Sequence, residues 1–307
     1  MPVGGYQGST FGDLIERTYR RLLANQREQI VVASGAVLNT DTAITFAGPA
    51  AAGVHPGSIV ALEDEKVLVT GTTPNNNAYN WTVLRAFQGS TAANHADQTV
   101  GILDPKYDRF DIGVAINDAL NYLSSPTYGM FAIQLTTVTY NPVFRGYDLS
   151  ALPSNFIDIR EITYDTPDSS KNFPTIGRGD FKIRRGITNA KIPSSRALIL
   201  DVPAYPGLAV NIAAAVPFTN LILLTDDVIT QSGLPATAID IPSLCAEIDL
   251  SSTRDIKRNF IEAQPDSRTA TEVPFNAMTA AVQALVMLRD RRIAAEADRL
   301  HRLWPGY

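Results

Sequence analysis

The chain has 307 residues, of which 45% are apolar and 19% are charged, and its formal net charge is −5. This composition is that of a globular protein with enough apolar side chains for a core, and the mild acidity argues against a basic surface for tight nucleic-acid binding. The single cysteine, Cys245, excludes a disulfide within the chain, and no apolar run approaches the roughly 20 residues that span a bilayer.

The opening MPVGGYQGSTFG has neither the basic region nor the apolar core of a secretory signal. We therefore expect a soluble protein that folds inside the cell.

The first expected element is a helix over residues 11–27. Thr10 and Asp13 match a capping box in carboxylate form, and apolar residues recur on one helical face. The other face carries three arginines, Arg17, Arg20 and Arg21. Two interpretations remain open for this face: a solvated surface, or a contact with acidic groups of a neighbouring subunit.

From residue 30 to residue 103 the apolar period changes to two, which is typical of strands. Six short strands are expected, at residues 29–33, 42–46, 58–62, 66–70, 79–85 and 99–103. Turns rich in Pro, Gly and Asn separate them. So many short strands in one stretch predict a small barrel or a sandwich.

A second helix is expected over residues 109–123, with Asp108 as its N-cap. A second β-rich block follows, with its clearest strands at residues 131–140, 156–164, 180–184, 197–202 and 209–216. Residues 225–238 are expected to form a linker.

Two further helices are expected over residues 240–263 and 274–303, the first with Pro242 in its opening turn. The last would be roughly 45 Å long at 1.5 Å per residue, so it outruns the shorter helices. We expect part of it to pack on something else. For the tail from Trp304 to Tyr307, an aromatic anchor on a partner and a fold-back onto its own helices are both open.

Because each helix has one apolar stripe and must bury it, the sequence predicts an α+β fold: a split four-helix bundle with two β-rich insertions of the barrel or sandwich type. The expected parts are helix one at 1–28, β insertion one at 29–104, helix two at 105–128, β insertion two at 129–224, and helices three and four with the tail at 225–307.

The sequence offers little for catalysis. His55, His95 and His301 lack the spacing of a metal pair, and no phosphate-binding loop occurs. The run Glu63-Asp64-Glu65 could bind a hard cation, but its place between two strands favours a charged hairpin tip. We expect no catalytic residue, no metal and no cofactor, so a structural protein is favoured over an enzyme with an unrecognised carboxylate site.

Four segments resemble head-to-tail adaptor (connector, or neck) proteins of long-tailed double-stranded DNA phages. They are FGDLIERTYRRLLANQREQ at residues 11–29, RAFQGSTAANHAD at 85–97, ALNYLSSPTYGMFAI at 119–133 and IKRNFIEAQPDSRTATEVP at 256–274. The general fold of this family is a small helical bundle. The two β-rich blocks are additions relative to its smallest members.

The resemblance implies a homo-oligomeric ring, expected to be dodecameric, between the portal protein and the next connector, or stopper, protein. The virion neck would be its location, with assembly in the host cytoplasm. Phage DNA would pass through the channel without sequence-specific binding, and no membrane would be involved. The alternative is another virion component, a tail-tip or decoration protein that binds through its β domains.

The resemblance and the arginine-rich helices together suggest contacts to portal or to neighbouring subunits. The candidate contact residues are Arg17, Arg20, Arg21, Arg292, Arg299, Arg302, Trp304 and Tyr307. We expect residues 293–307 to carry the main portal contact and both β-rich blocks to lie outside the ring.

Overall fold

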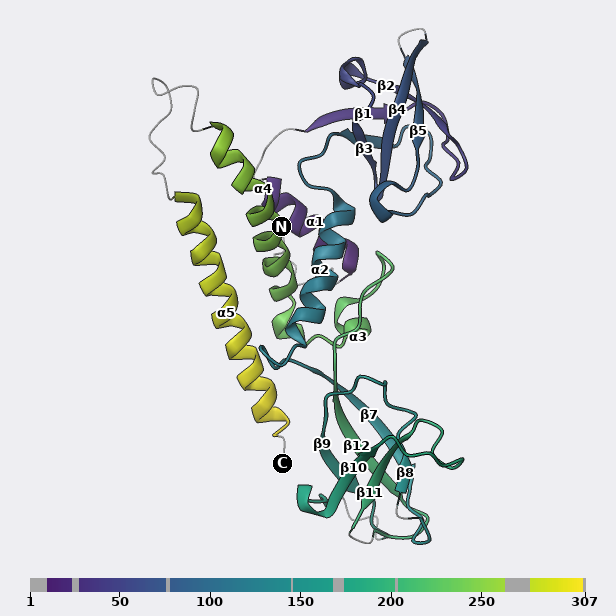
Figure 1. Cartoon of the computed structure of the whole chain (residues 1–307), viewed down its shortest axis with the longest axis vertical. Helices are drawn as coiled ribbons and strands as arrows, with labels where there is room; N and C mark the ends of the chain where they lie inside the picture. The colour runs from purple at the N-terminus through teal and green to yellow at the C-terminus, as the bar shows by residue number, and fades with distance from the viewer. Residues whose placement is uncertain are drawn as a thin grey trace, which may run out of the picture. The chain divides into compact units, whose positions relative to one another are not determined.

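The computed structural model describes residues 10–23, 28–75, 78–144, 146–167, 174–201, 204–262 and 277–305. Within these ranges the chain forms five α-helices and several β-sheets, a mixed α and β architecture (Figure 1). It divides into two compact units. Unit 1 comprises residues 1–118, 223–225 and 242–286, and unit 2 comprises residues 119–222, 226–241 and 287–307.

Unit 1 contains a closed barrel with the strand order β1-β2-β5-β4-β3-β6 (Figure 1). Its strands are β1 (Gln29–Ala33), β2 (Ala43–Ala47), β3 (Ile59–Leu62), β4 (Glu65–Asn75), β5 (Ala78–Leu84) and β6 (Val100–Leu103). β6 returns to pair with β1, placing Gln29 opposite Leu103. The first β-rich block is therefore a barrel, which settles the choice that the sequence left open.

Alternating apolar side chains fill the barrel, as expected for closed sheets. Phe46 and Trp81 are fully buried at its centre, with ring centroids 4.3 Å apart. A Cβ on Gly101 would lie only 2.9 Å from a methyl carbon of Leu62, so the close packing requires a glycine there. The other core residues are Val31, Ala33, Val37, Ile44, Ala51, Val60, Val67, Val69, Val83 and Leu103.

The remainder of unit 1 is helical. It contains α1 (Phe11–Leu23), the first part of α2 (Arg109–Leu123) and most of α4 (Ile241–Glu262). A Cβ on Gly113 would lie 3.3 Å from side-chain atoms of both Phe11 and Ile15, so α1 packs closely on α2. The buried hydroxyls of Thr18 and Ser243 are hydrogen-bonded, so α1 also packs on α4.

Both expected helix caps are confirmed. Thr10 and Asp13 form the capping box at α1, with the amide of Asp13 3.2 Å from the Thr10 hydroxyl oxygen. Asp108 accepts from the amide of Phe110 at 2.8 Å and caps α2. The split four-helix bundle is not confirmed, because α5 (Ala277–Leu303) is divided between the two units.

Unit 2 contains two three-stranded antiparallel sheets, ordered β7-β12-β9 and β10-β11-β8 (Figure 1). The strands are β7 (Ala132–Thr139), β8 (Gly146–Asp148), β9 (Asp158–Tyr164), β10 (Phe181–Arg185), β11 (Arg196–Leu200) and β12 (Ala209–Val216). β8 was not expected from the sequence. The expected linker over 225–238 is also wrong in part, because it contains α3 (Val228–Ser232).

Candidate functional site

Two of the three arginines of α1 already have partners inside unit 1. Arg20 is paired with Glu16 one turn away at 2.9 Å, and Arg21 is paired with Glu247 of α4 at 2.9 Å. Arg17 is partly exposed. Exposed pairs of this kind contribute little to stability, so Arg20 and Arg21 can exchange their partners for acidic groups of another chain at small cost.

The arginines of α5 have two different roles. Arg292 and Arg299 converge on buried Glu296, Arg299 at 2.8 Å and Arg292 at 3.6 Å. Arg292 also pairs with Asp240 at 2.8 Å, and this hydrogen bond raises the pKa of the Arg292 guanidinium. Glu296 further accepts the hydroxyl of Thr237 at 2.9 Å. Arg292 therefore pairs α5 with Asp240 of its own unit, and Arg299 neutralises the Glu296 carboxylate that also bonds Thr237.

The end of α5 is more accessible. The Arg302 side chain is 83% exposed and sits 3.6 Å from exposed Asp298. Trp304 is half-buried, and its amide donates to the carbonyl of Leu300 at 2.9 Å. Tyr307 lies outside the described residues. Among the predicted contact residues of α5, Arg302 is thus the one best placed to meet another molecule.

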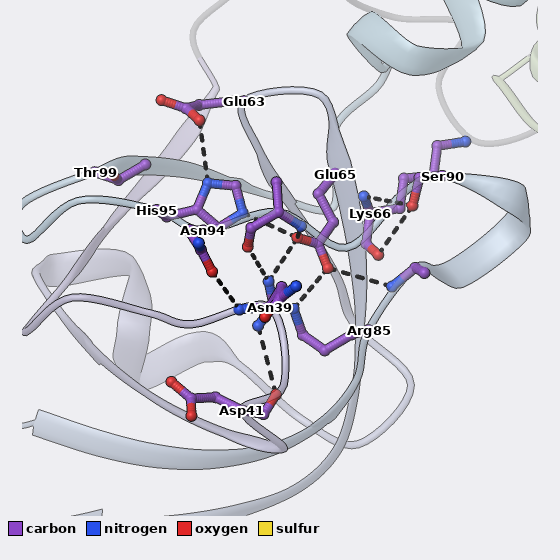
Figure 2. Close-up of polar contacts among 12 residues, drawn as sticks. Asn39, Asp41, Glu63, Glu65, Lys66, Arg85, Ser90, Asn94, His95 and Thr99 are labelled. Carbon is purple, nitrogen blue, oxygen red and sulfur yellow. Dashed lines mark hydrogen bonds and ion pairs between the residues drawn. The ribbon is translucent and has the colours of Figure 1, made fainter.

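A buried charged cluster links the loops at one end of the barrel (Figure 2). We call Glu65, Arg85 and His95 the Glu65 cluster. The guanidinium of Arg85 donates two hydrogen bonds to the carboxylate of Glu65, at 2.6 and 2.7 Å. Nε2 of His95 lies 2.9 Å from the same carboxylate. The amides of Ala86 and Ala93 donate to the same carboxylate.

Burial alone would raise the pKa of Glu65, but the hydrogen bonds from Arg85, the Ala93 amide, His95 and the Ala86 amide outweigh burial and lower it to about 2. The Glu65 side chain is only 1% exposed. Through these bonds the Glu65 carboxylate ties together the loops that carry Arg85, Ala86, Ala93 and His95.

This finding corrects the expectation of a charged tip at residues 63–65. Glu63 and Asp64 form the turn, and the Glu63 side chain is 60% exposed, but Glu65 begins β4 and points inward. Within the described residues no group of three or more acidic, histidine or cysteine side chains could hold a metal ion.

A second buried charge joins the barrel to α2. The ammonium of Lys66 forms an ion pair with Asp111, lies 3.2 Å from the side-chain oxygen of Gln88, and sits 5.5 Å from the centre of the Phe110 ring. Only 4% of the Lys66 side chain is exposed. Its pairing orders the start of α2 against the barrel wall.

Next to this junction lies a cavity of about 250 Å³. Its lining is Tyr19, Ala61, Glu63, Thr99, Val100, Ile102, Tyr107, Asp108 and Arg109. Burial raises the pKa of the Asp108 carboxyl and of the Tyr19 phenol, and for Tyr19 a hydrogen bond to Glu28 adds to the effect. The guanidinium of Arg109 lies over the Tyr19 ring and pairs with Glu16 at 2.7 Å. The Tyr19, Glu16, Glu28 and Arg109 side chains therefore interact beside the cavity, whereas Asp108 caps α2.

Sequence reasoning missed the Glu65 cluster and buried Lys66. Arg85 and His95 fall in the second segment of the family resemblance, residues 85–97, which was the one available signal. Nothing local identifies Lys66 as buried, because it lies between an acidic run and the apolar run Val67-Leu68-Val69.

Comparison with known protein families and with curated protein sequences finds no match for this chain. Among the helices in the described ranges, none combines the length and apolar character needed to cross a bilayer.

Proposed function

We propose that the protein is a structural subunit of the phage neck, a head-to-tail adaptor that forms a ring between the portal and the stopper protein and leaves a channel for DNA. The observation that carries the proposal is the helical part of unit 1. Its α1 is the first segment of the family resemblance, and it packs on α2 and α4 although up to 226 positions separate their contacting residues. A small helical core with β-rich additions is what the resemblance implies.

Charge supports the same role. The chain has a net charge of −5, and most of the arginines predicted to form contacts have carboxylate partners in their own unit. A channel wall rich in unpaired Lys and Arg would retain DNA by counterion release. A wall whose cations are neutralised lets DNA slide.

The barrel fits the outside of such a ring. Exposure of Arg85 or His95 to the channel would count against this placement, and their side chains are only 8% and 1% exposed because they pair with buried Glu65. The barrel lies, in this proposal, away from the DNA path.

The test is negative-stain imaging and light scattering of the purified chain, alone and with portal protein. An adaptor gives rings stacked on the portal when the two proteins are mixed, with closed cyclic symmetry. A chain that forms no ring and does not bind portal rejects the adaptor role and favours the tail-tip or decoration alternative.

Two charge reversals locate the portal contact. Arg302→Glu should weaken co-sedimentation with portal by about tenfold or more, because reversing a charge at an interface creates like-charge contacts. Lys182→Glu is the matched control, since Lys182 is also an exposed cation, 66% accessible, that pairs with an exposed acid in the same unit. If Arg302→Glu binds portal as well as the unmodified chain does, Arg302 is not part of the portal contact. The α1 residues Arg17, Arg20 and Arg21 then become the candidates for it.

A further inference from the structure

The sheet β7-β12-β9 has two outer strands, and the described residues cover the edge of only one of them. Along β9 the amide of Ile176 donates to the carbonyl of Ile162 at 2.8 Å, and the amide of Tyr164 donates to the carbonyl of Pro174 at 3.2 Å. The segment around residues 174–176 thus occupies the outer edge of β9.

No strand or loop in the described part of the chain pairs with the outer edge of β7. Tyr140 directs both backbone groups toward the neighbouring strand, because its amide donates to Leu208 and its carbonyl accepts from Gly207, each at 2.9 Å. Backbone groups alternate in direction along an antiparallel strand, so those of Ile133, Leu135, Thr137 and Thr139 point away from β12. Within the described parts of the chain, these outward groups have no hydrogen-bond partner.

β7 also lacks the features that usually protect an edge. Its sequence, AIQLTTVT, contains no charged residue and no proline, and it pairs with β12 from Ala132 to Thr139 without a bulge. Leu135 is 72% exposed on this strand. By contrast β10 (FKIRR) carries three cations, and the barrel of unit 1 is closed and presents no edge.

We propose that β7 pairs antiparallel with β7 of a second copy of this chain, with Ile133 opposite Thr139 and Leu135 opposite Thr137. This register uses every outward backbone group and joins the two three-stranded sheets into one continuous sheet. The partner must bring an open, uncharged strand of matching length, and β7 is the described strand that meets this need. The pair does not rest on the adaptor role. Because a two-fold contact differs from the head-to-tail contacts of a cyclic ring, the pair belongs to the free chain and not to the ring.

A two-fold axis then passes beside Thr136, which makes the register testable by cysteine substitution. Thr136 would face its own counterpart in a non-hydrogen-bonded pair, where Cα atoms are about 4.5 Å apart, within the range for a disulfide. In a Cys245→Ser background, Thr136→Cys should form a covalent dimer under mild oxidation, read on a non-reducing gel.

The matched controls are Leu135→Cys and Thr137→Cys. Leu135 of one copy lies opposite Thr137 of the other copy and not opposite its own counterpart. Each variant alone should therefore form the disulfide-linked dimer at least about tenfold more slowly than Thr136→Cys. Mixing the two should restore linkage. If Thr137→Cys links to itself as fast as Thr136→Cys, the proposed pair is overturned.

A second measurement follows the free full-length chain by sedimentation over a range of concentrations. Thr137→Lys should raise the dimer dissociation constant by about tenfold or more, since edge lysines block strand pairing. Val143→Lys, at a site 81% exposed just beyond β7, should leave it unchanged, with circular dichroism checking that both variants fold. A chain that stays monomeric, or whose β7 takes up a strand of a different protein instead, contradicts the proposal.

Discussion

Glu65 shows how a single residue can organise a set of loops. Its carboxylate receives bonds from side chains and amides that lie 20 to 30 positions away in the sequence, and Arg85 extends the network to the carbonyl of Leu38 at 2.6 Å. The sequence places Glu65 in a run of three acids, a pattern typical of an exposed turn. The partners that bury it are distant, so local pattern cannot separate it from Glu63.

Replacing Glu65 should therefore lower the stability of the folded chain. Glu65→Gln leaves buried Arg85 without its countercharge, and we expect a loss of about 3 kcal/mol in the free energy of unfolding. Glu63→Gln, at a site 60% exposed, should lose less than about 1 kcal/mol. Urea unfolding followed by Trp81 fluorescence in a Trp304→Phe background measures both, since the chain has two tryptophans. Equal losses would contradict a structural role for the cluster.

The same residue predicts a dependence on pH. Because the pKa of Glu65 is about 2 in the folded chain against 4.5 ordinarily, its stabilisation is fully present above 4.5 and is lost as the pH falls from there through 2. The unmodified chain should lose stability over this range more steeply than Glu65→Gln does. Unfolding midpoints at several pH values provide the comparison, and parallel slopes would exclude the effect.

Two glycines allow two effects of a Gly→Ala substitution on stability to be measured separately: backbone strain and side-chain crowding. Gly233 and Gly186 have nearly the same φ, +75° and +74°. A Cβ on Gly233 would lie 2.6 Å from Cβ of Ala132, whereas a Cβ on Gly186 would meet no atom of the described residues within 4 Å. Gly186→Ala should cost about 1 kcal/mol for its left-handed backbone. Gly233→Ala should cost about 1–3 kcal/mol more, from overpacking. Thermal unfolding of the two variants would show the difference. Similar unfolding midpoints would mean that a Cβ at position 233 does not crowd Ala132.

At the level of elements, periodicity located most helices and strands. α2 and β12 begin and end where the sequence predicted, and so does β1. β8 was missed because three residues are too few to show an alternating pattern. α3 was missed although its signals were present: Asp227 caps it through the amide of Thr230, and Gly233 ends it. A five-residue helix is too short to display an apolar stripe.

The contact between α1 and α4 could not be predicted as a specific pair, and a double-mutant cycle tests it. Thr18→Val leaves the buried hydroxyl of Ser243 without its partner and should cost about 1–3 kcal/mol. In the Thr18→Val, Ser243→Ala double variant neither hydroxyl remains unpaired, so a coupling of about 1 kcal/mol is expected. Urea denaturation of the four chains gives the value, and additive effects would mean that the two hydroxyls do not interact.

On the scale of the whole molecule, the chain leaves its helices to build a barrel and then returns. Gln29 and Leu103 lie opposite each other where the barrel begins and ends, so the barrel is attached to unit 1 through neighbouring points. The sequence indicated the block and its strands. It could not indicate closure, which depends on the pairing of β1 with β6 across the whole block, nor the division of α5 between two units.

The barrel should therefore fold by itself. A fragment of residues 28–105 keeps every ladder and the buried core around Trp81, and we expect cooperative unfolding with blue-shifted Trp81 emission in its folded form. The control fragment 28–98 lacks β6 and leaves β1 and β3 with open edges, so it should remain unfolded or aggregate. Indistinguishable emission from the two fragments would show that the barrel depends on the helices.

The contact between Thr18 and Ser243 has a consequence for synthesis on the ribosome. The two residues are 225 positions apart, so at 5–20 residues per second α4 emerges roughly 10–45 s after α1. The last strand of the barrel ends at Leu103, 140 positions before Ser243, so the barrel can close before α4 is made. α2 can cover the side of α1 around Phe11 and Ile15 soon after the barrel is made, but the side around Thr18 stays exposed to chaperones and to other nascent chains until α4 arrives.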